Sequence, residues 1–330
     1  MTNDRRRGLI LIDKDPGPSS FHTIAQLRRL LGIKKIGHAG TLDPFASGLL
    51  LIAYGKATSA LERLTSLDKS YEVTIRFGQA TDTGDSEGEI VAEQTVDLVR
   101  DLGEEGSRLK KTLSQFKGEQ WQTPPMHSAI KVQGQRLYEL ARRGETVERP
   151  PRKIEVSDIR FVSLQPAGDF VDAVLTLDVS SGTYVRTLAV TIGESLGIPA
   201  HARELRRTSI GRFDVQDAHR LEPWFDRFNE LGRDSAVFYD ERLQAGDLLP
   251  LRYAFSDLAT VSLSLPEATM AFHGRTLSLE ASRVSSTLKT GDQVWLDYNG
   301  NDVALAEVID AGAQLILKMS RVWIDHEHLH

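Results

Sequence analysis

The hydrophobic positions at the start of the chain predict a strand, a turn and a helix. Residues 8–12 are continuously apolar, which predicts a short buried strand, and a turn rich in proline and glycine follows them. Apolar residues recur at helical spacing over residues 21–31, with Ser19 or Ser20 as the N-cap. Two further strands are predicted by a continuous apolar run and by an alternating one, at residues 48–54 and 71–77.

The middle of the chain predicts a surface loop, a helical insertion and a basic lobe. Residues 80–89 are acidic and rich in turn formers, so we expect a surface loop, and residues 97–117 fit a charged helical insertion. Residues 123–152 carry prolines at both ends and basic residues between them, which suggests a mobile basic lobe around a helix near residues 136–143. Strands near 154–164 and 170–180 and a helix from about 184 to 196 complete this part.

The last eighty residues predict a small β module. A boundary is expected between about 220 and 250, where prolines and glycines interrupt an acidic segment. Asn299-Gly300 is the strongest hairpin signal of the chain. Short apolar stretches, each a predicted strand, lie at 294–298, 303–309 and 314–318. We therefore expect two domains, residues 1–247 and residues 248–330.

Composition limits the class of protein without identifying it. The 330 residues are 40% hydrophobic and 26% charged, which is typical of a soluble protein, and no apolar run approaches the roughly 20 residues of a membrane helix. We therefore expect a cytoplasmic protein. The absence of cysteine excludes disulfides, thiolate metal sites and cysteine nucleophiles.

The net charge of −6 argues only weakly against a nucleic-acid partner, because the charge is unevenly distributed. Residues 1–60 hold nine Lys and Arg against four Asp and Glu, whereas residues 61–109 hold five against twelve. A basic face therefore remains compatible with an acidic total.

Two motifs do not support the chemistry they suggest. His326-Glu327-His328-Leu329-His330 matches the pattern of zinc proteases, but it lies at the very end of the chain and lacks a third ligand, so no metal is expected. Gly48 and Gly55-Lys56 resemble a phosphate loop, yet their spacing is too long and Ala57 replaces the magnesium-binding hydroxyl.

The candidate chemistry lies in Gly37-His38-Ala39-Gly40-Thr41-Leu42-Asp43-Pro44-Phe45-Ala46-Ser47-Gly48-Leu49-Leu50. This segment places Asp43 in a glycine-flanked turn just before a buried strand. Taken alone, Asp43 is more simply explained as a turn-forming aspartate. The whole segment, however, resembles the signature loop of the TruB family, the bacterial tRNA pseudouridine-55 synthases.

Four other stretches resemble the same family in the same order, over about residues 8–222. They are Tyr71 with its strand; Thr81-Asp82-Thr83-Gly84-Asp85; Gln122 through Lys131 to Arg142; and Ser180 to Arg186. The resemblance implies an α+β catalytic domain with a mixed, mainly antiparallel sheet and a basic RNA-clamping insertion at about 123–152. Residues 250–325 resemble, more loosely, a PUA-type RNA-binding module.

The resemblance also implies roles for single residues. Asp43 would be the nucleophile, Arg186 the partner that keeps it ionised, and Tyr71 the residue that stacks beside the target base and moves a proton. The implied substrate-binding residues are His38, which would enter the RNA loop, Leu205, an apolar wall, and Lys14, Asp85 and Lys131. Without the resemblance, each has an ordinary structural explanation, and Asp85 fits a role in shaping its loop equally well.

The reaction implied is the isomerisation of uridine 55 in the T-loop of tRNA, after base flipping. Substrate and product are isomers, so no cofactor is expected, and the T-stem–loop is the expected partner of a monomer that needs no other protein. Attack at the sugar C1′ or the base C6 stays open. Two departures from the family pattern are His127, at a usually aromatic position, and the turn Lys14-Asp15-Pro16. The rival interpretations are a guide-dependent synthase for ribosomal RNA and an inert RNA-binding or tRNA-folding protein.

Overall fold

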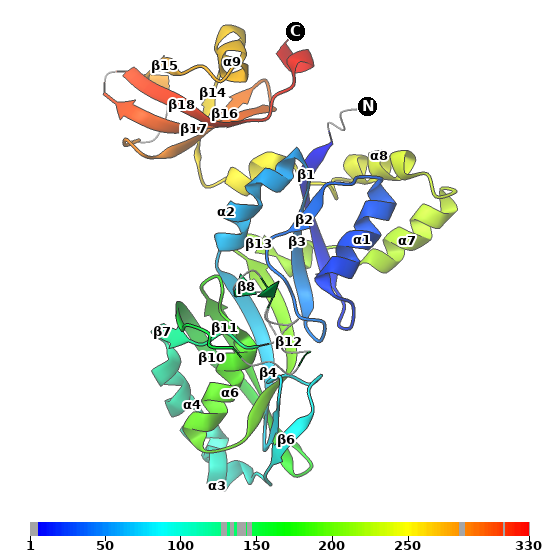
Figure 1. Ribbon diagram of the computed structural model, residues 1–330, viewed down its shortest axis with the longest axis vertical. Coiled ribbons are helices and arrows are strands. Elements are labelled where there is room, and N and C mark those ends of the chain that lie inside the picture. The colour runs from blue at the N-terminus through cyan, green and yellow to red at the C-terminus, as the bar shows by residue number, and fades with distance from the viewer. Residues whose placement is uncertain are drawn as a thin grey trace. The chain divides into compact units, whose positions relative to one another are not determined.

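The computed structural model describes residues 6–126, 131–132, 135–136, 143, 147–283, 288–312 and 314–329. The chain divides into two compact units. The larger unit consists of Ile10–Ala53 and Leu61–Asp247. The smaller unit consists of Leu248–His330 together with two early segments, Met1–Leu9 and Tyr54–Ala60. Figure 1 shows the helices and strands of both.

A nine-stranded sheet forms the centre of the larger unit. Its main path runs β1-β3-β12-β4-β11-β10-β7, with β2 paired to β3 and β13 paired to β12. The strands are β1 (Arg7–Lys14), β2 (Ile36–His38), β3 (Ser47–Gly55), β4 (Lys69–Phe77), β7 (Gly118–Gln122), β10 (Arg152–Ala167), β11 (Phe170–Val179), β12 (Ala200–Ile210) and β13 (Phe213–Asp214). β12 pairs with β3 in parallel, and it pairs with β4 antiparallel, as β4 does with β11 and β11 with β10. The predicted α+β class with a mixed, mainly antiparallel sheet is confirmed.

Helices cover this sheet in two groups. One group consists of α1 (Ser20–Leu31), α7 (Leu221–Glu230) and α8 (Ser235–Ala245), which pack on one another (Figure 1). In the other group α6 (Val185–Leu196) packs on β12 and β4, and α4 (Ser107–Leu113) packs on α6. Among the described residues of this unit, the remaining α-helices are α2 (Leu61–Ser66) and α3 (Leu98–Leu102). The helical insertion predicted for 97–117 is confirmed by α3 and α4.

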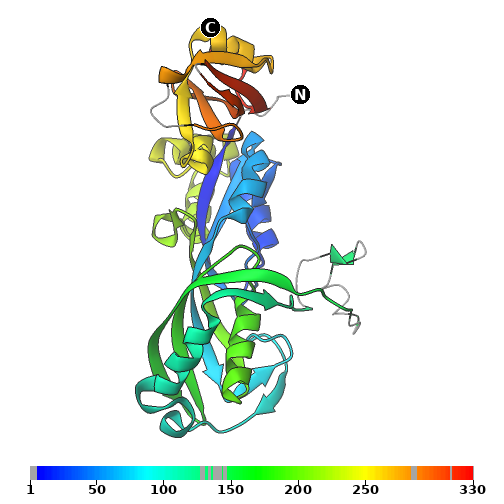
Figure 2. The ribbon, with the colours of Figure 1, turned by 90° about the vertical axis from the view of Figure 1, so that its left-hand side faces the viewer.

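Two short hairpins extend from the unit. One joins β5 (Gln79–Thr81) and β6 (Ile90–Glu93), and the other joins β8 (Lys131–Val132) and β9 (Gln135–Arg136). The β5–β6 hairpin packs against β12, whereas Figure 2 shows β8 and β9 projecting from the main sheet. The helix predicted near 136–143 falls almost wholly outside the described residues.

The start of α1 decides between the two predicted N-caps. Ser19 is the N-cap, and its hydroxyl accepts a hydrogen bond from the backbone N–H of His22 at 3.2 Å. Ser20 is instead the first residue of the helix, and its side chain is buried. That position frees the Ser20 hydroxyl for the contact with the candidate site described below.

The smaller unit is a curled five-stranded sheet in the order β14-β16-β17-β18-β15. The elements are β14 (Ala259–Ser262), α9 (Leu265–Phe272), β15 (Leu277–Glu280), β16 (Gln293–Tyr298), β17 (Asn301–Ala311) and β18 (Gln314–Val322). The predicted hairpin is confirmed, because Asn299 and Gly300 both have positive φ between the paired residues Tyr298 and Asn301. The sheet is consistent with a PUA-like module.

Metal-binding groups and membrane-spanning helices are both absent from the described residues. No group of three or more His, Asp or Glu side chains there is arranged to hold a metal ion. Within the same residues, no helix combines the length and the apolar character needed to cross a membrane.

Candidate active site

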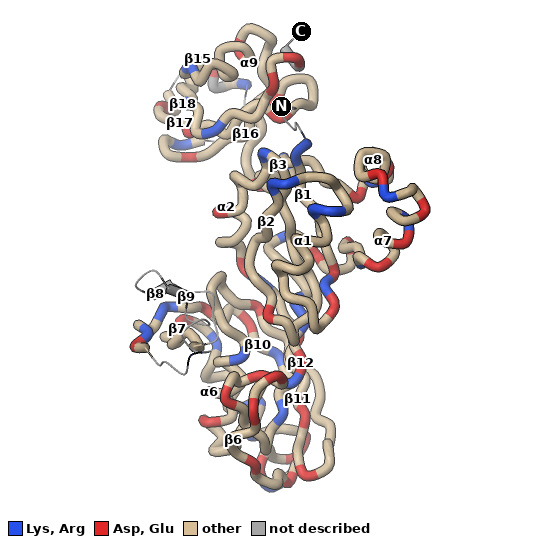
Figure 3. The backbone as a smooth tube through the Cα atoms, turned by 45° about the vertical axis from the view of Figure 1, so that its right-hand side comes forward, with Lys and Arg blue, Asp and Glu red and all other residues tan. Residues whose placement is uncertain are grey.

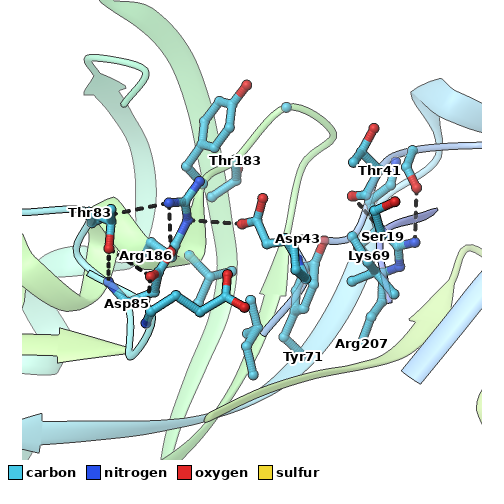
Figure 4. A pocket seen from close by; sticks show the side chains of 18 of the residues that line it. Ser19, Thr41, Asp43, Lys69, Tyr71, Thr83, Asp85, Thr183, Arg186 and Arg207 are labelled. Carbon is cyan, nitrogen blue, oxygen red and sulfur yellow. Dashed lines mark hydrogen bonds and ion pairs between the residues drawn. The ribbon is translucent and has the colours of Figure 1, made fainter. Parts of the chain in front are cut away.

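An open pocket of about 610 Å³ lies in the larger unit (Figure 4). Five residues predicted for the site line it: Asp43, Tyr71, Asp85, Arg186 and Leu205. They come from the β2–β3 loop, β4, the β5–β6 hairpin, α6 and β12. Residues far apart in the sequence therefore meet in one cavity, whose volume is typical of a ligand site.

Three hydrogen bonds clamp the loop that carries Asp43 to the start of α1. The hydroxyl of Ser20 donates to the carbonyl of Leu42 and accepts from its N–H, both at 2.9 Å. The N–H of Gly17 donates to the carbonyl of Pro44 at 2.7 Å. Asp43 thus stands between two anchored neighbours, so its backbone is held in place before any substrate binds.

Gly48 of the signature loop is required by the close approach of β12. Its φ is +100°, and a Cβ there would lie 2.2 Å from the carbonyl oxygen of Arg207. No side chain fits that gap, and no L residue adopts that φ readily. The glycine therefore lets the strand that follows Asp43 run beside the strand that carries Leu205.

Arg207 is a buried anchor of the same loop that sequence analysis missed. Its side chain is 1% exposed, and its guanidinium donates to the carbonyls of Leu49 at 2.8 Å, Gly40 at 3.0 Å and Thr41 at 3.4 Å. Nothing in the sequence marks Arg207 for this role, because its partners are backbone carbonyls that only the folded chain brings together.

Arg186 joins two carboxylates. It lies in the first turn of α6 and is 4% exposed; its Nε is 2.9 Å from Oδ2 of Asp43, and its Nη1 is 2.8 Å from Oδ2 of Asp85. Asp85 is buried as well, and its Oδ1 accepts from the hydroxyl of Thr83 at 2.6 Å. The surface loop predicted for 80–89 is therefore wrong at Asp85, because the ion pair draws that carboxylate inside.

Burial and charge act in opposite directions on Asp43. Its side chain is 33% exposed, and desolvation raises the pKa of its carboxyl above the ordinary value. The charge of Arg186 lowers that pKa, Asp85 raises it, and Lys14 lowers it. Glu87 lines the same pocket, and burial and the nearby carboxylates raise its pKa too. Arg186 is thus the main group that favours the ionised form of Asp43.

Tyr71 and Leu205 supply an apolar wall on adjacent strands. Tyr71 pairs with Arg207 in the β4–β12 register, and Leu205 pairs with Val73. Both side chains are largely buried, and both line the pocket. A ligand with a flat, neutral ring is well suited to such a wall, because its ring can stack on the phenol of Tyr71.

Lys14 and His38 do not line the pocket. The Lys14 ammonium donates to the carbonyls of Asp15 at 2.8 Å, Pro18 at 2.9 Å and Pro44 at 3.3 Å, and burial lowers the pKa of Lys14 to about 8. Its contacts therefore position the Asp43 loop.

The His38 ring packs edge to face on Phe21, with centroids 5.7 Å apart. Burial, with the charge of Arg207, lowers the pKa of His38. The side chain of Lys131, and all of His127, lie outside the described residues.

Gln122 and Tyr184 form a further link that sequence analysis did not find. The Gln122 amide donates to the carbonyl of Tyr184 at 3.0 Å and accepts from its N–H at 2.8 Å. The pair joins the end of β7, where the basic segment starts, to the N-cap of the helix that carries Arg186. It gives Gln122, the first residue of the stretch from Gln122 to Arg142, a structural function.

Comparisons with known proteins bear on this fold and on the family of the chain. The structure matches the crystal structure of a Cbf5-Nop10-Gar1 complex with a TM-score of 0.68 and 24% identity, covering 98% of this chain and 86% of that one. The structure of an H/ACA RNP bound to a substrate RNA containing 2′-deoxyuridine gives 0.68 at 22% identity, with 97% and 86% covered. At this identity the likeness shows a shared fold.

Sequence similarity is stronger. Residues 28–185 match the TruB family pseudouridylate synthase N-terminal domain, and residues 186–245 match the tRNA pseudouridylate synthase B C-terminal domain. The tRNA pseudouridine synthase B of Geobacillus thermodenitrificans is 41% identical over 83% of this chain and 86% of its own length. That of Thermobifida fusca is 37% identical over 85% and 96%. The chain belongs to the TruB family of pseudouridylate synthases, which are isomerases.

Proposed function

We propose that this enzyme converts uridine 55 in the T-loop of tRNA to pseudouridine, with Asp43 as the nucleophile. Its relatives are named tRNA pseudouridine synthase B, which supports the substrate. The observation that carries the proposal for Asp43 is its ion pair with Arg186, 2.9 Å long, inside the pocket. A carboxylate attacks only when ionised, and Arg186 favours that form despite burial.

The reaction rearranges bonds within one nucleotide. The bond between N1 of uracil and C1′ of ribose breaks, the base turns, and a bond between C5 and C1′ forms. C5 then loses its proton to an acceptor, and N1 gains one, so atoms and charge balance without a cofactor. Asp43 forms the transient covalent bond, at C1′ or at C6. Tyr71 stacks on the base and assists the proton movement at C5.

Access to the base requires flipping it out of the RNA loop. We propose that His38 enters the loop in its place, and that Lys131 and other basic residues of 123–153 bind backbone phosphates. Two exposed basic residues, Arg152 and Lys153, start β10, and Figure 3 shows the basic positions near β7 and β10. Lys153 also pairs with Glu119 at 2.6 Å, and the proposal is that these cations attract RNA locally on a protein whose net charge is −6.

The proposal favours a single chain that acts on tRNA in the cytoplasm as a monomer. The guide-dependent alternative rests on structural neighbours at 24% identity or less, a likeness that extends to the fold only. The relatives with 37–41% identity carry the name of a tRNA synthase. An inert RNA-binding protein would have no need of a buried arginine shared between two pocket carboxylates.

The test is tritium release from a T-stem–loop labelled at C5 of the target uridine, with the purified chain alone. We expect release by the native protein and a loss of more than about 10⁴-fold in Asp43→Asn. Glu222→Gln, an exposed carboxylate of α7, is the matched control and should retain full activity. Binding without release by the native protein would support the inert or guide-dependent alternatives.

A further inference from the structure

The pocket has a second, cationic part. Lys69 and Arg207 line it together with the hydroxyl residues Ser19, Thr41 and Thr65. Figure 4 shows Lys69, Arg207, Thr41 and Ser19 grouped on the side of Asp43 opposite to Arg186. The proposed chemistry uses only the other side, so this group requires its own explanation.

Neither cation forms an ion pair with a carboxylate in the part of the chain that the structure describes. The Lys69 ammonium donates to the carbonyls of Thr65, at 2.6 Å, and Leu67. Arg207 donates only to the three loop carbonyls already named. An ammonium has three donor hydrogens and a guanidinium five, so both side chains retain spare donors.

Two neighbouring buried cations without a counter-ion are costly. Lys69 is 6% exposed and Arg207 is 1% exposed. Burial first, and then the charge of Arg207, lower the pKa of Lys69 to about 8, against a smaller attraction from Asp68. A bound anion would relieve both the desolvation and the repulsion between the two cations.

We propose that Lys69 and Arg207 bind one phosphodiester of the substrate strand, next to the flipped uridine. The inference rests on the proposed function. A nucleotide held at Asp43 stays linked to its neighbours by a phosphate on each side, each with one negative charge. The uracil itself is neutral and suits the wall of Tyr71 and Leu205, whereas the cationic part of the same pocket suits the phosphate.

The experiment is a set of T-stem–loops in which single phosphodiesters near the target uridine are replaced by neutral methylphosphonates. We expect one position at which the native protein loses kcat/KM by about tenfold or more, because a charge-assisted contact is removed. On the unmodified RNA, the kcat/KM of Lys69→Met should be lower than that of the native protein by a similar factor. Introducing the methylphosphonate at that one position should not lower it further. Lys69→Arg should restore most of the loss and the sensitivity to this position.

Lys117→Met is the matched control, because Lys117 precedes β7 at the end of the strand order, is exposed and pairs with Asp158. It should keep the native sensitivity at every position. The salt dependence gives a second readout: the slope of log affinity against log salt should fall by about 0.7 in Lys69→Met, the value for one phosphate on a single strand.

Two results would overturn the inference. One is a native protein that tolerates every methylphosphonate, a result that does not depend on whether any variant folds. The other is a Lys69→Met protein whose losses add to those of each methylphosphonate, which would leave Lys69 a purely structural role. In both cases the unmodified RNA still releases tritium, whereas failure of the proposed function abolishes release by the native protein.

Discussion

Arg186 is the residue on which the chemistry of the pocket depends most directly. Its planar guanidinium reaches Asp43 with one nitrogen and Asp85 with another. A lysine offers a single point charge and cannot bridge the two carboxylates in this way. Because Asp43 must be ionised to attack, weakening this pair changes the pH at which the enzyme works.

We predict that Arg186→Lys shifts the acid limb of the kcat/KM profile to higher pH. Arg186 lowers the pKa of Asp43, against burial and Asp85, which raise it. With that contribution reduced, the pKa rises further, and a larger fraction of Asp43 is protonated at any given acidic pH. A pH–rate profile on the stem-loop tests this, with Glu222→Gln as control. An unshifted limb in Arg186→Lys would show that the limb does not report Asp43.

Asp43→Asn should raise stability while it abolishes turnover. The folded-state pKa of Asp43 is raised above its ordinary value near 3.8, so the folded protein binds more protons than the unfolded chain between these two values. Stability therefore falls as pH rises through that window, and asparagine avoids the loss. Urea unfolding from pH 3 to 8 should show a difference that is absent at the acid end and constant above the folded pKa. A less stable Asp43→Asn at pH 7.5 would contradict this.

The site residues that sequence analysis predicted belong to motifs, whereas those that it missed are defined by their contacts with backbone groups. Asp43, Tyr71 and Arg186 belong to motifs, so a resemblance to a family was enough to predict that they meet. Ser20 and Arg207 act through backbone carbonyls and N–H groups of distant segments, and Lys69 acts through carbonyls of the turn just before it. Backbone groups are the same at every residue, so no sequence pattern shows which of them a side chain will reach.

At the scale of elements, β12 was not predicted although it lies at the centre of the sheet. Its sequence Ala-His-Ala-Arg-Glu-Leu-Arg-Arg-Thr-Ser-Ile has four charged residues among eleven, so it lacks the apolar run of a buried strand. Two of its three arginines pair with an aspartate, and the third, Arg207, donates to backbone carbonyls. Arg206 pairs with Asp13 at 2.9 Å, and Arg203 pairs with Asp172. Such pairs are visible only after the strands have come together.

Helices α7 and α8 were missed because the residues at their ends were interpreted as breaks in a loop. Prolines and glycines at 220–250 were interpreted as interruptions, but they mark helix ends. Pro223 lies in the first turn of α7, where its missing N–H costs nothing, and Gly246 is the C-cap of α8 with a φ of +82°. Proline and glycine are common in loops, but they are also common at the first turn and at the C-cap of a helix.

Gly48→Ala tests whether the contact between β3 and β12 sets the Asp43 loop. The new Cβ would lie 2.2 Å from the Arg207 carbonyl, at a φ of +100°, so we expect a loss of about 3 kcal/mol in unfolding free energy and lower activity. Gly168→Ala is the matched control: its φ is +69° but its Cβ meets open space, and it should cost only about 1 kcal/mol. Equal losses in urea unfolding would rule out the close approach as the cause.

At the scale of the whole molecule, the smaller unit includes two segments from the start of the chain, residues 1–9 and 54–60, although the rest of it begins at residue 248. Arg7 donates to the carbonyl of Trp323 at 2.7 Å, and the indole of Trp323 donates to Ser59 at 3.1 Å. The N–H groups and carbonyls of Leu9 and Leu249 also pair. A chain cut after residue 247 would leave these segments without partners, so truncation tests stability and RNA binding at once.

The role of the smaller unit in RNA binding is therefore better tested by surface substitution. Arg275, Lys318 and Arg321 are exposed basic residues of that unit, within the segment 250–325 that resembles a PUA-type module. Replacing all three with alanine removes charge without disturbing the core, so the free energy of unfolding should be unchanged within about 0.5 kcal/mol per site.

If the unit contacts tRNA beyond the T-stem–loop, KM for full-length tRNA should rise several-fold in this triple variant, and the salt slope should fall, while kcat and the kinetics on the stem-loop alone stay constant. An equal rise in KM for both RNAs would mean that these charges act through general steering of RNA, and no change for either would exclude these three residues from binding.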